Sequence, residues 1–296
     1  MSYMGHDNSK SGLTVFLNRM LQIIFRVKPL QFRYALELYF CMLLDCYRAV
    51  FNKLNQSLAE GSRQCLRKIL RNKVILVDSF YFIVPNYRDF TCVISERLVH
   101  RFILKAIENG LVEIFCDIGA HIGSYTVRYA KFVRTIIAFE PNPLALTYLK
   151  RNLVMNGLNN VKLYPIALSD SIGKLKLYLH EELGWSTILR GKRKRGCLEV
   201  KTVKLDSILQ ELDSDRILIK IDVEGAEPEV LMGSINILSV KRPIIICEIL
   251  LENLARIKGI LHKQNYLMIQ IEDLNYLLVP KERLGQILNM LQEIIS

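Results

Sequence analysis

Apolar runs and helical spacing alternate along the chain from about residue 115 to its end. Short, strongly apolar runs predict buried strands, and these lie at 115–118, 136–139, 217–221, 243–248, 266–271 and 276–279. Apolar residues at helical spacing predict helices, at 125–132, 251–263 and 284–295. The alternation predicts an α/β fold, in which a mostly parallel sheet lies between two layers of helices. Because the last two strands are joined by a short turn, one of them must be antiparallel.

The N-terminal part of the chain has a different pattern. Only Pro29 and Gly61 would interrupt helices in residues 13–70, and charged positions fall there on a narrow stripe. This part also supplies most of the chain's net charge of +11. A basic amphipathic segment either packs as a cap on the rest of the chain or lies on an anionic membrane surface. We therefore predict a helical N-terminal extension, 1–72, and a second domain, 73–296.

The composition says more about the cellular compartment of the protein than about its chemistry. Hydrophobic residues make up 51% of the chain, yet no uncharged run approaches the roughly 20 residues of a membrane-spanning helix. The polar opening MSYMGHDNSKSG argues against a signal peptide. The seven cysteines are scattered singly, without metal-ligand spacing, as is typical of reduced core thiols. These features predict a cytoplasmic protein, with peripheral contact at the inner face of the membrane as an option.

The segment FCDIGAHIGSYT, residues 115–126, predicts a strand that passes into a helix through two glycines. Gly119 and Gly123 lack a Cβ, so a ligand can approach the backbone. Asp117 stands at the carboxyl end of the strand, where open α/β sheets bind ligands. The spacing differs from the G-x-G-x-x-G of dinucleotide sites, and an acid stands where a diphosphate would be repelled. A ligand with an amine and a cationic centre fits better, which favours S-adenosylmethionine over NAD. A simple strand-to-helix turn is the alternative.

Acidic residues end two further predicted strands. Glu140 lies about 20 residues beyond the glycine loop, where nucleotide-binding units place an acid that hydrogen-bonds ribose hydroxyls. Capping of the next helix is the alternative role for Glu140. Asp222 ends the strand that carries Lys220. Ionisable groups at a buried strand end are costly without a function, so we predict a polar site in which Asp222 and Asp117 face each other.

These segments together resemble the FkbM-type family of S-adenosylmethionine-dependent methyltransferases. The resemblance extends over about residues 75–250 and is strongest over DIGAHIG, AFEPNP and KIDVEGAE. It implies a Rossmann-like class I methyltransferase sheet, mostly parallel with one antiparallel strand near the C-terminus, and S-adenosylmethionine as cofactor. The cofactor site that it implies contains Asp117, Gly119, Gly123, Glu140, Asn142 and Ala167. The first 70 residues match no feature of the family.

Many members of this family methylate hydroxyl groups on sugars, glycolipids or natural products, so the resemblance implies O-methylation of such an acceptor. Methyl transfer is an in-line displacement, for which an enzyme mainly aligns the two substrates. A hydroxyl acceptor must also lose its proton to a general base. The candidate bases are Asp222, then Glu248 at the end of the next strand, then His121 in the glycine loop. His121 is alternatively a spacer whose ring packs over the loop.

Two acids after Asp222 have a structural explanation. Glu224 and Glu227 precede a helix that starts near Pro228, where the helix dipole favours negative charge. With Asp222 they could also bind a divalent cation through oxygen ligands. The chain offers no matched ligand set, so we predict no metal.

A basic stretch, RGKRKRG at 190–196, lies between two alternating segments, 174–180 and 197–205. The pattern predicts an exposed hairpin, whose loop is either merely solvated or contacts a phosphate or carboxylate of the acceptor. Nucleic acid is a third option, but no recognisable RNA-binding domain accompanies the charge. The predicted partner is a small-molecule or glycan acceptor, and an anionic or lipid-linked acceptor is one option. The sequence does not predict the oligomeric state.

Two rival functions are compatible with the same broad pattern. One is a nucleotide-binding oxidoreductase, which Asp117 and the missing G-x-G-x-x-G disfavour. The other is a non-catalytic scaffold that retains the fold for binding. Polar residues at all three strand ends argue against the scaffold, and turnover is the observation that separates it from an enzyme.

Overall fold

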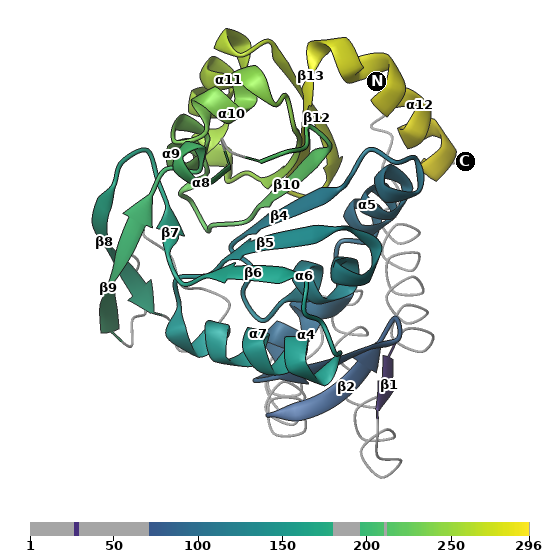
Figure 1. The fold of residues 1–296 in the computed structure, drawn as a ribbon, viewed down its shortest axis with the longest axis vertical. Coiled ribbons are helices and arrows are strands. Elements are labelled where there is room, and N and C mark those ends of the chain that lie inside the picture. Colours follow the sequence, from purple (N-terminus) through teal and green to yellow (C-terminus); the bar gives the residue numbers. More distant parts are fainter. Residues whose placement is uncertain (1–26, 30–70, 180–195, 210–211, 296) are drawn as a thin grey trace, which may run out of the picture. The chain divides into compact units, whose positions relative to one another are not determined.

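The computed structural model describes residues 27–29, 71–179, 196–209 and 212–295 (Figure 1). The chain divides into two compact units, Met1–Ser95 and Glu96–Ser296. The predicted boundary between residues 72 and 73 stays a prediction, because most of the extension that it delimits lies outside the described residues.

The described part of the first unit is a small antiparallel sheet followed by a helix. Its strands are β1 (Val27–Pro29), β2 (Lys73–Val77) and β3 (Phe80–Val84), and the helix is α4 (Tyr87–Ile94). Two residues with positive φ, Asp78 and Ser79, join β2 to β3 in the manner of a tight hairpin turn. The helical prediction for residues 13–70 is therefore wrong at β1, and the rest of that segment lies outside the described residues.

The second unit is built on a seven-stranded sheet in the order β12-β13-β11-β10-β4-β5-β6. In chain order these strands are β4 (Ile114–Ile118), β5 (Thr135–Phe139), β6 (Val161–Tyr164), β10 (Ile217–Ile221), β11 (Ile244–Glu248), β12 (Tyr266–Glu272) and β13 (Asn275–Pro280). β13 runs antiparallel to both of its neighbours, whereas the other neighbouring pairs are parallel. The predicted sheet, mostly parallel with one antiparallel strand near the C-terminus, is confirmed.

Helices cover both faces of this sheet. They are α5 (Arg97–Glu108), α6 (Ser124–Tyr129) with η1 (Ala130–Phe132), α7 (Pro143–Met155), α8 (Asp206–Leu209), α9 (Glu227–Met232), α10 (Ile235–Val240), η3 (Leu251–Asn253) with α11 (Leu254–Lys263), and η4 (Lys281–Arg283) with α12 (Leu284–Ile295). Figure 1 shows α9, α10 and α11 together on one side of the sheet and α5, α6 and α7 on the other. The predicted helices are confirmed, with short 3-10 turns at the ends of three of them.

The order of the strands locates the point where ligands bind in such a sheet. From β4 the chain moves through β5 to β6 on one side, and it later continues from β10 through β11 on the other side. β4 and β10 are adjacent and parallel, with Ile118 opposite Ile221. This is the switch point of a doubly wound sheet, and ligands bind outside the carboxyl ends of the strands there.

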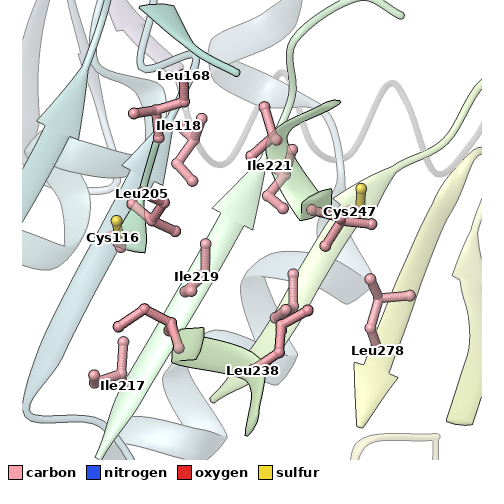
Figure 2. Close-up of a cluster of buried hydrophobic side chains, with 14 of the residues drawn as sticks. Cys116, Ile118, Leu168, Leu205, Ile217, Ile219, Ile221, Leu238, Cys247 and Leu278 are labelled. Carbon is pink, nitrogen blue, oxygen red and sulfur yellow. The ribbon is translucent and has the colours of Figure 1, made fainter. Parts of the chain in front are cut away.

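The two faces of β10 differ in chemistry because side chains alternate along a strand. Ile217, Ile219 and Ile221 point into the main hydrophobic core, beside Cys116 of β4 and Cys247 of β11 (Figure 2). The positions between these isoleucines point to the other face of the sheet. One of them is Lys220, which is completely buried although it is charged. The face of the sheet that α5 and α6 cover therefore contains a buried ion.

A second sheet lies between β6 and β10 in the sequence. It has the order β7-β9-β8, with β7 (Ala167–Leu168) parallel to β9 (Gly196–Val203) and β8 (Gly173–Leu179) antiparallel to β9. The predicted hairpin is confirmed in its strands. Its loop, which contains most of the basic stretch, lies outside the described residues.

Within the described ranges, no helix combines the length and the apolar character that a bilayer crossing requires.

Candidate active site

The loop between β4 and α6 contains two glycines at positions where a side chain would not fit. A Cβ on Gly119 would lie 1.8 Å from the carbonyl oxygen of Asp222, and a Cβ on Gly123 would lie 2.5 Å from Cδ1 of Leu149. Both glycines also have positive φ, 84° and 95°. Gly119 thus lets the loop contact the end of β10, and Gly123 lets α6 pack on α7.

The backbone amides of this loop are engaged within the protein. Gly119 and Ala120 both donate to the carbonyl oxygen of Phe139 at 3.0 Å, and Gly123 donates to that of Ala120. The N–H of His121 donates to Glu140 Oε2 at 2.8 Å. A diphosphate site needs such amides to point at the ligand. The loop is therefore tied to the end of β5 and is unsuited to hold a dinucleotide's pyrophosphate.

Asp117 is buried beneath the loop and holds the start of α6. Its Oδ2 accepts from the backbone N–H of Thr126 at 3.0 Å and from the Thr126 hydroxyl. Burial raises the pKa of Asp117 to about 6, and the Thr126 hydrogen bonds and the charge of Lys220 oppose this effect. The register places Lys220, not Asp222, directly opposite Asp117, so the expected face-to-face pair of aspartates is replaced by an acid beside a lysine.

Glu140 joins two loops at the end of β5. Its Oε2 accepts from His121, and its Oε1 accepts from the backbone N–H of Asn142 at 2.7 Å. Burial raises the pKa of Glu140, while His121 and the two N–H donors oppose the rise. The side chain of Asn142 accepts from the N–H of Leu144 and so caps α7. The cap of α7 is therefore Asn142 and not Glu140. The two carboxylate oxygens of Glu140 remain as polar groups at the end of β5.

Asp222 and Glu248 form a pair at the carboxyl ends of β10 and β11. Asp222 directly follows β10, where its N–H donates to Ile118 O at 2.9 Å, and it lies beside Gly119. The negative charge of Asp222, followed by burial, raises the pKa of Glu248 to about 9. This shift favours the protonated form of Glu248 at neutral pH.

Lys220 lies under this pair in a cluster of polar side chains from five elements. Its Nζ is 3.7 Å from Asp222 Oδ2 and 3.2 Å from Oδ1 of Asn275, and it lies 5.3 Å from the ring centre of Tyr125. Asn275 Nδ2 donates to Glu96 Oε1 at 2.8 Å, and the hydroxyl of Tyr125 donates to Glu96 Oε2. We refer to Lys220, Asp222, Glu248, Asn275, Glu96 and Tyr125 as the Lys220 cluster.

The other predicted site residues have local roles in the fold. His121 has a φ of 51° and contributes its backbone N–H to Glu140. Glu227 accepts from the N–H of Gly225 and from Asn253, as expected of an acid that orders a helix start. Ala167 lies in the small sheet, paired with Thr202 of β9. The described residues include no group of three or more His, Cys, Asp or Glu side chains placed to hold a metal ion.

The sequence did not single out Glu96, Tyr125 or Asn275. Glu96 precedes α5 with a φ of 60°, Tyr125 lies in the first turn of α6, and Asn275 begins β13. The only signal available was Asn275, a polar residue that opens the otherwise apolar run NYLLVP and is buried. Each of the three reaches Lys220 or its partners only through tertiary packing.

The raised pKa of Glu248 predicts a pH-dependent stability. Between the ordinary carboxyl range and about pH 9 the folded chain keeps a proton that the unfolded chain has released. Unfolding then releases this proton, so the free energy of unfolding falls as pH rises through that window. Glu248→Gln removes the group, and its stability relative to wild type should increase steadily from about pH 5 to about pH 9. Urea unfolding at several pH values measures this difference.

A matched variant controls for the loss of one carboxylate. Glu252→Gln changes an exposed acid on η3. In this variant the free energy of unfolding should change with pH as steeply as it does in the wild type. A difference between Glu248→Gln and wild type that stays constant with pH contradicts the raised pKa of Glu248.

The sheet order, its single antiparallel strand and the acids at the switch point define the chain as a class I methyltransferase fold. Residues 117–277 match the model of the Methyltransferase FkbM domain, and the chain belongs to this family. The resemblance to the FkbM-type family noted in the sequence is confirmed.

Known proteins agree at the level of the family. The methyltransferase sdnD of Sordaria araneosa is 35% identical over a match that covers 40% of this chain and 58% of that protein. Methyltransferase 1 of Beauveria bassiana is 26% identical, with 40% and 56% covered. The chain thus spans little more than half the length of these relatives. Among solved structures, methyltransferase FkbM from Methylobacillus flagellatus KT matches with a TM-score of 0.43 and 12% identity, covering 91% of this chain and 59% of that one.

Proposed function

We propose that this chain transfers the methyl group of S-adenosylmethionine to a hydroxyl group of a sugar, glycolipid or related natural product. The observation that carries the proposal is the pair of acids Asp222 and Glu248 at the carboxyl ends of the adjacent strands β10 and β11, with Asp222 beside the glycine loop at the switch point. A carboxylate in this position can accept the proton of a hydroxyl acceptor. S-adenosylmethionine supplies the methyl group on a cationic sulfur.

The residues at the strand ends suit a cationic ligand. Asp117, Glu140, Asp222 and Glu248 lie at the ends of four neighbouring strands, and the loop amides are engaged in the protein. These features repel a diphosphate and favour a ligand with an amine and a positive centre. Glu140 is the acid that would hold the ribose hydroxyls, since each of its oxygens accepts one backbone N–H and has further lone pairs.

The charges balance when the pair acts as base. Before the reaction the pair has one proton and one negative charge, opposite the positive charge of the methyl donor. The acceptor oxygen forms a bond to the methyl carbon, and its proton passes to the pair, which then holds two protons and no charge. A bound donor would become a neutral thioether when it loses the methyl group, so its positive charge and the negative charge of the pair would disappear together.

Glu140→Gln should weaken the binding of S-adenosylmethionine by about tenfold or more. Hydrogen bonds to a charged group contribute roughly 1.5–3 kcal/mol each, and 1.4 kcal/mol corresponds to a factor of ten in affinity. Isothermal titration calorimetry measures the change. Thr147→Ala is the matched control, because it removes an exposed side-chain hydrogen bond on α7 and leaves Glu140 and the backbone N–H that it accepts in place. Unchanged affinity in a folded Glu140→Gln protein would falsify the ribose assignment.

The experiment that tests the function uses extracts as a source of acceptors. Glycans and lipids from cells that lack the protein are incubated with the purified chain and methyl-tritiated S-adenosylmethionine. Label that enters a glycan or glycolipid as a base-stable ether supports O-methylation. Binding of the donor without transfer to any extract favours the scaffold function instead. Label in the lipid fraction alone would support an acceptor at the cytoplasmic face of a membrane.

A further inference from the structure

Lys220 has no exposed surface, so neither the methyl donor nor the acceptor can touch it. A lysine is among the residues that are almost never fully buried unless they are paired. Its presence on β10 therefore needs a reason other than contact with a substrate. The partners of its ammonium group supply one.

The ammonium is held from three directions. Asn275 of β13 accepts from it at 3.2 Å, the ring of Tyr125 on α6 lies 5.3 Å away, and Asp222 lies 3.7 Å away at the end of β10. The Tyr125 ring is itself fixed by stacking on His100 of α5, at a centroid distance of 4.9 Å. The lysine is thus aimed at the carboxyl end of its own strand.

Among the described residues, the charged groups that act on Lys220 are acids. From β10 this is Asp222, from β11 Glu248, from the start of α5 Glu96, and from β4 Asp117. The thiol of Cys247 and the phenol of Tyr125 are the other titratable groups around it. Burial by itself disfavours the ammonium, but Asp222, Glu96 and Glu248 outweigh burial and raise the pKa of Lys220 above its ordinary value. Lys220 therefore stays charged over the whole range in which the carboxyls titrate.

We propose that Lys220 is a positioning residue whose buried ammonium keeps the Asp222–Glu248 pair at one shared proton, so that the pair meets the acceptor as a monoanion. Repulsion between two neighbouring carboxylates favours the binding of one proton, and burial favours the binding of a second, because it disfavours the charge that remains. A fixed cation under the pair opposes the binding of that second proton. The proposal rests on the proposed methyl transfer for its role, but the charge state of the pair is a property of the protein without ligands.

The test is a titration of the carboxyl carbons of the full-length protein by NMR, without ligand. Asp222 and Glu248 are identified by the signals lost in Asp222→Asn and Glu248→Gln. Lys220→Met keeps the length of the side chain and removes its charge, and it should move both titration steps of the pair to higher pH by roughly 1–3 units. Lys220→Arg keeps the charge and should leave the steps near their wild-type positions. Ile219→Val, on the opposite face of the same strand, controls for loss of stability alone.

A reciprocal measurement keeps the proposal falsifiable if Lys220→Met does not fold. Coupling between two sites acts equally in both directions, so Asp222→Asn should lower the pH at which the Cε signal of Lys220 titrates. The proposal is overturned if neither Lys220→Met shifts the pair nor Asp222→Asn shifts Lys220 by more than a few tenths of a pH unit.

A final arm separates this inference from the proposed function. S-adenosylmethionine should lower the pH at which Glu248 titrates more than S-adenosylhomocysteine does, because only S-adenosylmethionine has a positive sulfur. Both ligands could leave the titration of Glu248 unchanged while Lys220→Met still shifts it. The effect of the Lys220 charge on the pair would then be supported, and the placement of the methyl group beside the pair would be wrong.

Discussion

Asp222→Asn is expected to lower the rate of methyl transfer by about 10²–10⁴-fold, the contribution of a typical general base. The substitution keeps the shape of the side chain and removes the charge that accepts the proton. The cofactor should still bind, because Glu140, the acid assigned to its ribose, lies two strands away from Asp222. Transfer of label from methyl-tritiated S-adenosylmethionine measures the rate, and calorimetry measures the affinity.

Glu248→Gln is the matched control for this experiment. It leaves the carboxylate of Asp222 in place with a hydrogen-bond donor beside it, so its loss of rate should be smaller. The double variant should be no slower than Asp222→Asn alone, because residues that act as one unit are not additive. An Asp222→Asn protein with the wild-type rate eliminates Asp222 as the base and leaves Glu248 and His121 as candidates.

Gly119→Ala is expected to abolish cofactor binding and to lower the melting temperature by about 4–20 °C. The added Cβ would lie 1.8 Å from the Asp222 carbonyl oxygen, which is backbone and cannot rotate away. Left-handed φ costs a residue with a Cβ about 1–2 kcal/mol, and overpacking adds about 1–3 kcal/mol. At roughly 2–4 °C per kcal/mol these costs give the expected shift. Displacement of the loop from β10 also moves Asp222.

Gly157→Ala controls for the backbone conformation alone. Gly157 also has a positive φ, 65°, but a Cβ there meets no atom within 4 Å. Its melting temperature should fall only by the cost of the left-handed conformation, about 2–8 °C on the same scale, with cofactor binding intact. Equal effects of the two substitutions would show that the close approach of the loop to β10 does not matter.

The sequence by itself determined the layers of the fold and the order in which its acids occur. Period-two and period-3.6 patterns are local properties, so strands such as 217–221 and helices such as 284–295 could be predicted from their own residues. Asp117, Glu140, Asp222 and Glu248 could be placed at strand ends for the same reason. A parallel α/β sheet brings the carboxyl ends of its strands to one edge, which was enough to predict a site.

Only the tertiary structure decided what these residues contact. The register of β4 and β10 sets Asp117 opposite Lys220, and the insertion of β13 beside β11 brings Asn275 to Lys220 and to Glu96, 179 positions away in the chain. Gly119 was predicted as a point of ligand approach, and only the fold shows that its missing Cβ also makes room for the backbone carbonyl of Asp222. Such contacts depend on distances between distant segments, and no local pattern encodes them. The raised pKa of Glu248 is of this kind, because it arises when the ends of β10 and β11 bring Asp222 and Glu248 together.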